Sequence, residues 1–414
     1  MLRSELAELI GNGENSGVEF KRDDVHPDAL AKEMAALLNL EGGRVLLGVE
    51  EEGSVSGLTR DPQQAEQWVM NICRDHLQPA IIPYWETLGW GDRLVVGILS
   101  LPADSPKKPY KARRGSAWVT FIRVGSTSRE ATREEEARLY QASGLVRYDI
   151  KPVPGSSWAD LDGRRLQNYF QAIRQQEAPP LEDHTTWERL LLNTEFMVEH
   201  GQRRIPTAAA VLLFGRNPNR FLPQAGVTAA AFPGTHKDYA ARERVQLRGP
   251  IAPLLSSQGE VVEDGLVGQT LNFVRRNTAV EARLDEGGRR HDRWDYPLEA
   301  VREAIVNAIA HRDYSIGVTD IELSLYSDRL EIISPGRLPN TVTVEKIRHG
   351  YRATRNELIK EVLRDYRYVE AIGLGIPRQI IRGMREHNGT APDLVEQEDR
   401  FLVRLWKGRG AMPG

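Results

Sequence analysis

The sequence predicts an α/β protein with more than one domain. At 414 residues the chain exceeds the usual size of a single hydrophobic core, so two or three domains are expected. Short apolar runs such as residues 44–49 predict buried strands, and they alternate along the chain with amphipathic stretches that predict helices. A segment rich in Pro, Gly and Ser at residues 150–157 predicts the first domain boundary.

The composition narrows the class of protein. Hydrophobic residues make up 40% and charged residues 27% of the chain, as in ordinary globular proteins. Cys73 is the only cysteine, which excludes an intrachain disulfide and a cysteine zinc site. A single cysteine is typical of proteins from a reducing compartment. No apolar run approaches the roughly 20 residues that span a bilayer, and the N-terminus lacks the apolar core of a signal peptide. Together these features predict a cytoplasmic protein without a membrane partner. The net charge of −3 means that nucleic-acid binding would need a local basic patch.

Three regions follow from the order of the elements. Residues 1–147 combine strands at 18–21, 44–49, 94–101 and 117–124 with helices at 2–10, 27–40 and 132–143. Residues 158–290 form a connector with strands at 208–214 and 227–232 and a helix at 251–275. Residues 291–410 hold a helix that begins at Pro297, strands at 321–326, 329–333 and 401–405, and a helix at 378–386.

Acidic residues surround the first predicted strand. Glu19 and Lys21 are two residues apart on it and therefore project to the same face. If this strand neighbours the one at 44–49, then Glu14, Glu19 and one of the three acids at 50–52 converge beside Lys21. Clustered carboxylates with a lysine suit a two-metal phosphodiesterase site. The alternative is a surface charge pair and a solvated turn.

A run of basic residues occupies 23 positions of the same region and predicts a surface that follows a phosphate backbone. The run consists of Lys107, Lys108, Lys111, Arg113, Arg114, Arg123 and Arg129. The alternative is the soluble surface of a hairpin.

The most informative stretch lies in the third region. Glu303, Asn307 and His311 are spaced four residues apart and share one face of an apolar helix. Buried polar groups need partners, because leaving one unpaired costs about 1–3 kcal/mol. Asn can offer a carbonyl oxygen to Mg²⁺, and Glu can orient a water. The alternative is that these side chains pair only with one another inside a helical layer.

Two later segments complete a predicted nucleotide pocket. Residues 333–339 run from a strand into a glycine-proline turn that contains Ser334 and Gly336. Gly373 and Gly375 open a helix whose bare N–H groups and dipole can hold phosphate oxygens. The pair Arg355-Asn356 either belongs to this pocket or is a solvated helix start.

The third region resembles the ATP-binding fold shared by gyrase, bidirectional histidine kinases and MutL (the GHKL fold), in a bacterial branch described as RecG-like. The likeness rests on His-Arg-Asp-Tyr at 311–314, the strand at 328–332, the turn at 335–339, Arg355-Asn356 and Gly-Leu-Gly-Ile-Pro at 373–377. It implies an α/β sandwich that binds ATP and Mg²⁺.

By this resemblance each polar residue receives a role. Asn307 would hold Mg²⁺, and Glu303 would orient the attacking water of an ATPase. The nucleotide would be lined by His311, Asp313, Ser334, Gly336, Gly373 and Gly375. Ser334 stands where the superfamily has an aspartate that reads adenine, so base recognition and hydrolysis are not part of what the resemblance implies.

Residues 14–129 resemble the Schlafen AlbA-type domain, with Lys-Pro-Tyr at 108–110 and residues 121–128 as further matching features. In eukaryotic Schlafen proteins a comparable acidic trio cuts structured RNA, whereas most bacterial relatives are described as nucleic-acid binding and linked to transcriptional control. The resemblance implies Glu14, Glu19 and Glu51 as ligands of Mn²⁺ or Mg²⁺, with Glu51 in place of the usual aspartate.

The leading hypothesis is an ATP-binding regulator whose nucleotide state changes how the N-terminal domain holds DNA or RNA, in transcription control or antiphage defence. The alternative is a metal-dependent endoribonuclease acting on tRNA or another structured RNA, with Glu14, Glu19 and Glu51 as its metal ligands. A third hypothesis is a nucleotide-sensing scaffold with neither activity. A homodimer is expected because proteins of the superfamily often dimerise.

Overall fold

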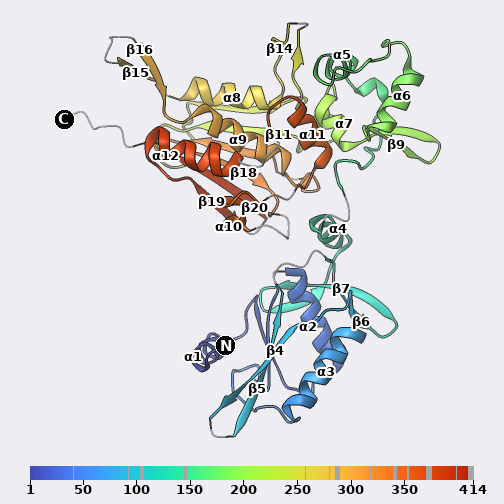
Figure 1. Cartoon of the computed structure of the whole chain (residues 1–414), viewed down its shortest axis with the longest axis vertical. Coiled ribbons are helices and arrows are strands. Elements are labelled where there is room, and N and C mark those ends of the chain that lie inside the picture. Colours follow the sequence, from blue (N-terminus) through green and yellow to red (C-terminus); the bar gives the residue numbers. More distant parts are fainter. Residues whose placement is uncertain are drawn as a thin grey trace. The chain divides into compact units, whose positions relative to one another are not determined.

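In the computed structural model the chain divides into two compact units, Met1–Val146 (unit 1) and Arg147–Gly414 (unit 2). The structure describes residues 1–40, 42–91, 93–102, 107–143, 147–256, 258–278, 280–284, 290–317, 319–338, 343–351, 354–369, 375–397 and 399–408. Helices and strands are mixed in both units, which confirms the predicted fold class (Figure 1). In these ranges, no helix is long and apolar enough to cross a membrane.

Within its described residues, unit 1 contains two four-stranded sheets, ordered β1-β2-β5-β4 and β3-β6-β7-β8. Its elements are α1 (Arg3–Asn12), β1 (Val18–Lys21), α2 (Pro27–Leu40), β2 (Gly43–Leu47), α3 (Pro62–Asp75), β3 (Leu77–Gln78), β4 (Tyr84–Trp90), β5 (Leu94–Leu101), β6 (Lys111–Arg114), β7 (Ala117–Val124), β8 (Thr127–Glu130) and α4 (Arg133–Ala142).

Helix α2 holds the two sheets of unit 1 together. Its Leu30 belongs to one buried cluster with Leu99 of β5 and Phe121 of β7. The other face of the first sheet packs on α1, where Leu6 meets Phe20 of β1. Because side chains alternate along β1, Glu19 lies on the α2 side of the sheet, and a residue predicted as a site residue is placed in the interior.

Unit 2 is built around α9 and a mixed sheet. Its elements are η1 (Trp158–Asp160), α5 (Gly163–Asn168), η2 (Tyr169–Ile173), α6 (His184–Asn193), β9 (Met197–His200), β10 (Arg203–Pro206), α7 (Ala208–Phe214), η3 (Pro218–Arg220), β11 (Gly226–Ala231), β12 (Glu243–Arg248), β13 (Leu254–Leu255), β14 (Val261–Glu263), α8 (Leu266–Asn277), β15 (Val280–Leu284), β16 (Arg290–Trp294), α9 (Leu298–Ala310), β17 (Ile321–Leu325), β18 (Arg329–Pro335), α10 (Val344–Arg348), α11 (Glu357–Asp365), η4 (Gly375–Arg382), α12 (Gly383–Asn388), β19 (Asp393–Gln397) and β20 (Arg400–Trp406).

The described strands of the main sheet run in the order β12-β11-β17-β18-β20-β19, and β11 pairs with β17 in parallel. The segment predicted as a connector therefore contributes two strands to the same sheet as the C-terminal region. Leu323, Ile332 and Val403 lie side by side across this sheet and join one core with Val301 and Ile305 of α9. This packing fixes which face of α9 remains for polar side chains.

Two predicted elements of the connector were wrong. Residues 208–214 form the helix α7 rather than a strand, and all seven are buried. A short apolar run buried on every side has no periodicity that separates helix from strand, and Thr207 decides the case by capping the helix through Ala210 N–H. The predicted helix at 251–275 contains β13 and β14, and only its last part belongs to α8.

Candidate functional sites

The polar face of α9 brings two predicted residues into direct contact. Asn307 donates a hydrogen bond from Nδ2 to Glu303 Oε1 over 2.9 Å. Glu303 is 8% exposed and Asn307 is half-buried. An amide that donates through its nitrogen keeps its carbonyl oxygen as an acceptor, so Asn307 retains the atom that a hard cation binds.

The first residue of η4 packs against Glu303. A Cβ added at Gly375 would overlap the Glu303 carboxylate, so only glycine lets the backbone approach this closely. Helix η4 continues into α12, and its first N–H groups and positive dipole end attract anions. The Glu303 carboxylate therefore lies where a phosphate oxygen would compete with it. Gly373, the other predicted phosphate-binding glycine, lies outside the described residues.

His311 ends α9 and is uncharged at neutral pH. Its backbone N–H donates to Asn307 O over 3.0 Å, which places the imidazole directly after the polar face. Burial, reinforced by the charges of Lys360 and Arg355, lowers the pKa of His311 to about 4. A neutral imidazole offers one donor and one acceptor rather than a cation.

The predicted base end of the pocket is structural in this arrangement. Ser334 is buried, and its hydroxyl donates to Ala308 O of α9 over 2.8 Å. Gly336 has a φ of +109°, and a Cβ there would lie 2.6 Å from Asp313 Cβ. Through Ser334 and Gly336 the turn after β18 packs against α9 and Asp313. The Ser334 hydroxyl therefore donates its hydrogen bond to the helix backbone and not to a base.

Asp313, Arg355 and Asn356 form a buried group at the end of α9. Asp313 Oδ2 lies 2.5 Å from Arg355 Nη1, and the Arg355 side chain is 5% exposed. Asn356 is fully buried and donates through Nδ2 to Ala310 O over 2.9 Å and to Arg312 O over 2.8 Å. The interpretation of Arg355-Asn356 as a solvated helix start was wrong, because both side chains bind the interior.

In unit 1, Glu19 is held between two cations. Its Oε1 accepts from Lys21 Nζ over 2.5 Å, and its Oε2 lies 2.5 Å from Arg123 Nη1. The Arg123 side chain is fully buried and also reaches Glu33 Oε2 of α2 at 3.1 Å. Burial raises the pKa of the Glu19 carboxyl, although the hydrogen bond from Lys21 opposes the shift. These contacts describe a buried ionic cluster that joins β1, β7 and α2.

The structure does not assemble the predicted metal trio. Glu14 accepts the Phe20 N–H over 2.8 Å and lies 3.9 Å from Lys21 Nζ, whereas Glu51 is exposed in the turn after β2. Across the ranges that the structure describes, which include Glu14, Glu19 and Glu51, no three His, Cys, Asp or Glu side chains are grouped to hold a metal ion. The geometry thus gives no support to the endoribonuclease hypothesis.

The predicted basic patch divides into buried and exposed members. Lys108 is 2% exposed and donates to Leu40 O, and Arg123 is buried, so neither side chain is available to a phosphate backbone. Lys111 pairs with Glu136 at 2.7 Å. The exposed members of the patch are Lys107, Arg113, Arg114 and Arg129.

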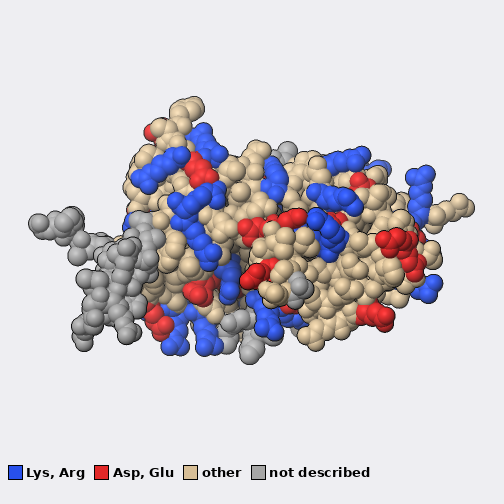
Figure 2. All heavy atoms as spheres, turned by 90° about the horizontal axis from the view of Figure 1, so that it is seen from above, with Lys and Arg blue, Asp and Glu red and all other residues tan. Residues whose placement is uncertain are grey.

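The exposed members differ in how they are held. Arg129 makes two hydrogen bonds to Glu135, at 2.7 and 2.9 Å, and Arg114 pairs with Glu130 at 3.1 Å. The Arg113 side chain, among the described residues, hydrogen-bonds only to the backbone oxygen of Gly115. On the face of the molecule seen in Figure 2, acidic and basic side chains are intermixed.

Comparison with known proteins supports both resemblances. Residues 14–132 match the family model described as Schlafen, AlbA_2, and residues 319–405 match the model described as Putative ATP-dependent DNA helicase recG C-terminal. Each match covers a part of the chain, and together the two descriptions point to a nucleic-acid-related protein of an ATP-binding type. Helix α9 precedes the second matched range, so the roles of its residues rest on geometry and on the sequence.

Two solved structures are similar to the chain at low identity. The DIP2311 protein from Corynebacterium diphtheriae is 18% identical, with a TM-score of 0.46, over 98% of this chain and 80% of its own. The N-terminal domain of a putative ATP-dependent DNA helicase RecG-related protein from Nitrosomonas europaea is 22% identical, with a TM-score of 0.24, over 31% of this chain and 90% of its own. No curated protein matches.

Two residues that organise these sites belong to no pattern in the sequence. Glu33 of α2 accepts from Arg123 and from Ser128 Oγ, and it is the second carboxylate of the cluster around Glu19. Asp149 is fully buried and accepts the Leu358 N–H at the start of α11 over 2.7 Å. Neither residue belongs to a motif. The one available signal was an acidic residue at a core position, which indicates a buried partner.

We predict that Glu19→Ala destabilises unit 1. The substitution leaves the buried Arg123 with Glu33 as its remaining carboxylate partner, and breaking a buried ion pair costs about 3 kcal/mol. Urea denaturation followed by circular dichroism measures the loss. Glu51→Ala is the matched control, and equal stability of the two variants would contradict the buried-cluster account.

We predict that His311 makes stability depend on pH below neutrality. Its folded pKa of about 4 lies below the value of about 6.5 in an unfolded chain, so the unfolded state binds more protons between these values. The contribution of neutral His311 to the free energy of unfolding is therefore fully present above about pH 6.5. It falls by roughly 3 kcal/mol as the pH decreases toward 4. Unfolding at several pH values should show a shallower dependence for His311→Gln; parallel curves would refute the assignment.

Proposed function

We propose that this protein is an ATP-binding regulator of nucleic acid, in transcription control or defence, whose nucleotide state at α9 changes how the Schlafen-type domain holds DNA or RNA. The observation that carries the proposal is the contact of Glu303 with Asn307 and with the start of η4. It gathers a metal-binding oxygen and a phosphate-attracting helix end at one place.

The residues present fit the metal and phosphate end of Mg²⁺–ATP. Asn307 would hold the metal through its carbonyl oxygen, and the η4 N-terminus would hold phosphate oxygens. Bound Mg²⁺ would supply the charge neutralisation that brings phosphates beside a carboxylate. Glu303 would have to withdraw from Gly375, and its carboxylate would then be free to orient a water.

Two hydrogen bonds and the start of α11 between them connect α9 with the first residues of unit 2. Asn356 binds the last carbonyl of α9 and is also the N-cap residue of α11. The next step is the bond from Leu358 N–H to Asp149, two residues after Arg147. Asp149 is therefore a route by which a shift of α9 reaches the segment joining the units. These contacts support coupling between the nucleotide site and unit 1. Coupling also requires an element with two states, and α9 with Glu303 would be that element.

In unit 1 the hairpin of β6 and β7 is the surface best suited to nucleic acid. Arg113 lies opposite Trp118 in the strand register, and Trp118 is 42% exposed. An arginine beside an exposed aromatic ring can bind a phosphate while the ring stacks on a base, which contributes about 1–3 kcal/mol per stacked base.

Nucleotide binding should respond in opposite directions to two substitutions on α9. Asn307→Ala removes the metal-binding oxygen and should lower the affinity for an ATP analogue with Mg²⁺ about tenfold, a loss of about 1.4 kcal/mol within the range of a charged hydrogen bond. Glu303→Gln removes the charge that competes for the η4 N-terminus and should raise affinity about threefold. Calorimetry measures both. Asn272→Ala, at an exposed position of α8, is the control for Asn307→Ala, and equal binding by these two variants would overturn the site.

For the nucleic-acid surface, Arg113→Ala should weaken binding and reduce the slope of log affinity against log salt by about 1, because one phosphate contact is lost. Trp118→Ala should weaken binding with little change in that slope. Fluorescence anisotropy with single-stranded DNA and RNA at several salt concentrations measures both. Arg129→Ala is the matched control because Glu135 already holds its guanidinium. A salt slope for Arg113→Ala equal to the control value would exclude the hairpin.

A further inference from the structure

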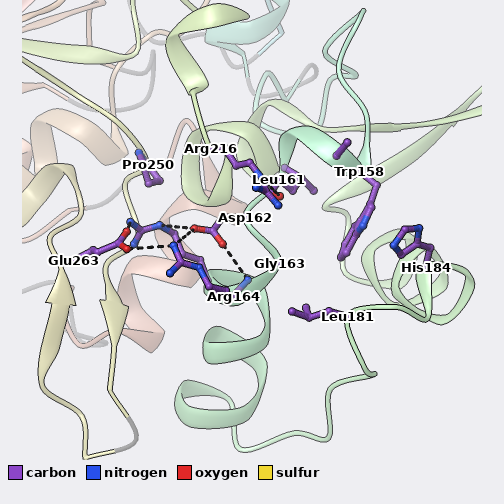
Figure 3. A pocket seen from close by; sticks show the side chains of 13 residues that line it. Trp158, Leu161, Asp162, Gly163, Arg164, Leu181, His184, Arg216, Pro250 and Glu263 are labelled. Atoms are coloured by element: carbon purple, nitrogen blue, oxygen red, sulfur yellow. Dashed lines mark hydrogen bonds and ion pairs between the residues drawn. The ribbon is translucent and has the colours of Figure 1, made fainter.

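A cavity of unit 2, away from α9, has the lining of a small-molecule site. It has a volume of about 570 Å³ and lies between η1, α5, α6 and β14 (Figure 3). Small-molecule sites in proteins usually measure about 300–1,000 Å³ and combine apolar walls with a few converging polar groups. None of the residues assigned above to the nucleotide or the nucleic acid lines this cavity.

One wall of the cavity is aromatic and rigidly supported. The rings of Trp158 and His184 lie 5.7 Å apart at an angle of 45°. Trp187 stands 5.4 Å from Trp158, is fully buried and donates its indole N–H to Pro180 O over 3.0 Å. Because Trp187 fixes Trp158 from within the core, the exposed part of Trp158 is a ready surface for a planar group.

The opposite wall is a balanced ionic group. Arg165 is buried and reaches Glu263 at 2.5 Å and Asp162 at 3.5 Å. Arg164 shares the same two carboxylates at 3.2 and 3.6 Å. The two arginines and two carboxylates neutralise one another, as the dashed lines in Figure 3 show. This wall therefore adds shape and hydrogen bonds but little net charge.

Arg216 gives the cavity its net positive charge. Its Nε donates to Leu161 O over 3.1 Å, which orients the guanidinium. Within the described parts of the chain Arg216 makes no ion pair, so its terminal nitrogens remain donors. In the view of Figure 3 it lies between the ionic wall and the aromatic pair. A guanidinium in this position suits a phosphate, which it binds with two parallel hydrogen bonds.

We propose that this cavity binds a nucleoside monophosphate, with the base against Trp158 and the phosphate on Arg216. The aromatic wall alone would accept any planar group, and Arg216 alone would accept any anion. Their placement on one cavity selects a ligand with both parts. The proposal concerns a site separate from α9 and does not depend on Mg²⁺ or on the function proposed above.

The test is calorimetry on the full chain with adenosine monophosphate in the presence of EDTA, which removes metal-dependent binding at α9. We expect adenosine monophosphate to bind at least tenfold more tightly than either adenosine or inorganic phosphate. Trp158→Ala and Arg216→Ala should each lower this affinity about tenfold, whereas Arg203→Ala, an exposed arginine on β10, should not.

A substitution that strengthens binding separates this proposal from a general loss of structure. Glu263→Gln removes one carboxylate from the ionic wall and should raise the affinity for adenosine monophosphate about threefold. Four results would each overturn the proposal. Three concern wild type: no binding of adenosine monophosphate, binding of phosphate as tight as that of the nucleotide, or binding of a 5′-phosphorylated oligonucleotide alone. The fourth result is unchanged affinity in both Arg216→Ala and Glu263→Gln.

Discussion

The bonds from Asn356 to the carbonyls at and just after the end of α9 are the constraint around which unit 2 is organised. A helix ends with carbonyl groups that have no partner within the helix, and here Asn356 Nδ2 satisfies that of Ala310 and also binds Arg312 O, two residues after the helix. Asn356 is fully buried, so a displaced α9 would leave these groups unpaired at a cost of about 1–3 kcal/mol each. Helices α9 and α11 are therefore held as one body.

The same end of α9 is tied to the sheet. Asp313 pairs with Arg355 and its N–H donates to Pro335 O of β18, while Ser334 donates to the α9 backbone. The result is a rigid frame around a helix whose remaining polar pair, Glu303 and Asn307, faces the start of η4. Rigidity at one end and a replaceable carboxylate contact at the other are the two properties that a nucleotide-responsive element needs.

The sequence predicted features that depend on local spacing. The period of the helix placed Glu303 and Asn307 on one face, and strand alternation placed Glu19 and Lys21 together. Features that depend on partners distant in sequence were not predictable in the same way. Arg123 was assigned to a surface patch because its charge suggested exposure, yet Glu19 and Glu33 hold it in the interior.

Two further differences have the same origin. Glu51 follows the strand beside β1, but adjacency of strands does not determine where the turn after one of them directs a side chain. Ser334 was expected to face a ligand because of its position in a motif, whereas the close approach of Ala308 O gave its hydroxyl a structural partner. Both outcomes depend on distances of a few ångströms between elements, which no single-sequence pattern encodes.

The central claim is that nucleotide at α9 changes the affinity of the protein for nucleic acid. The most direct test measures the dissociation constant of the full chain for one labelled oligonucleotide, with and without a saturating ATP analogue and Mg²⁺, in wild type and in Asp149→Ala. The account predicts a change of at least fivefold in wild type, the lower range of allosteric coupling, and a smaller change in the variant. Equal affinity in wild type with nucleotide bound would contradict it.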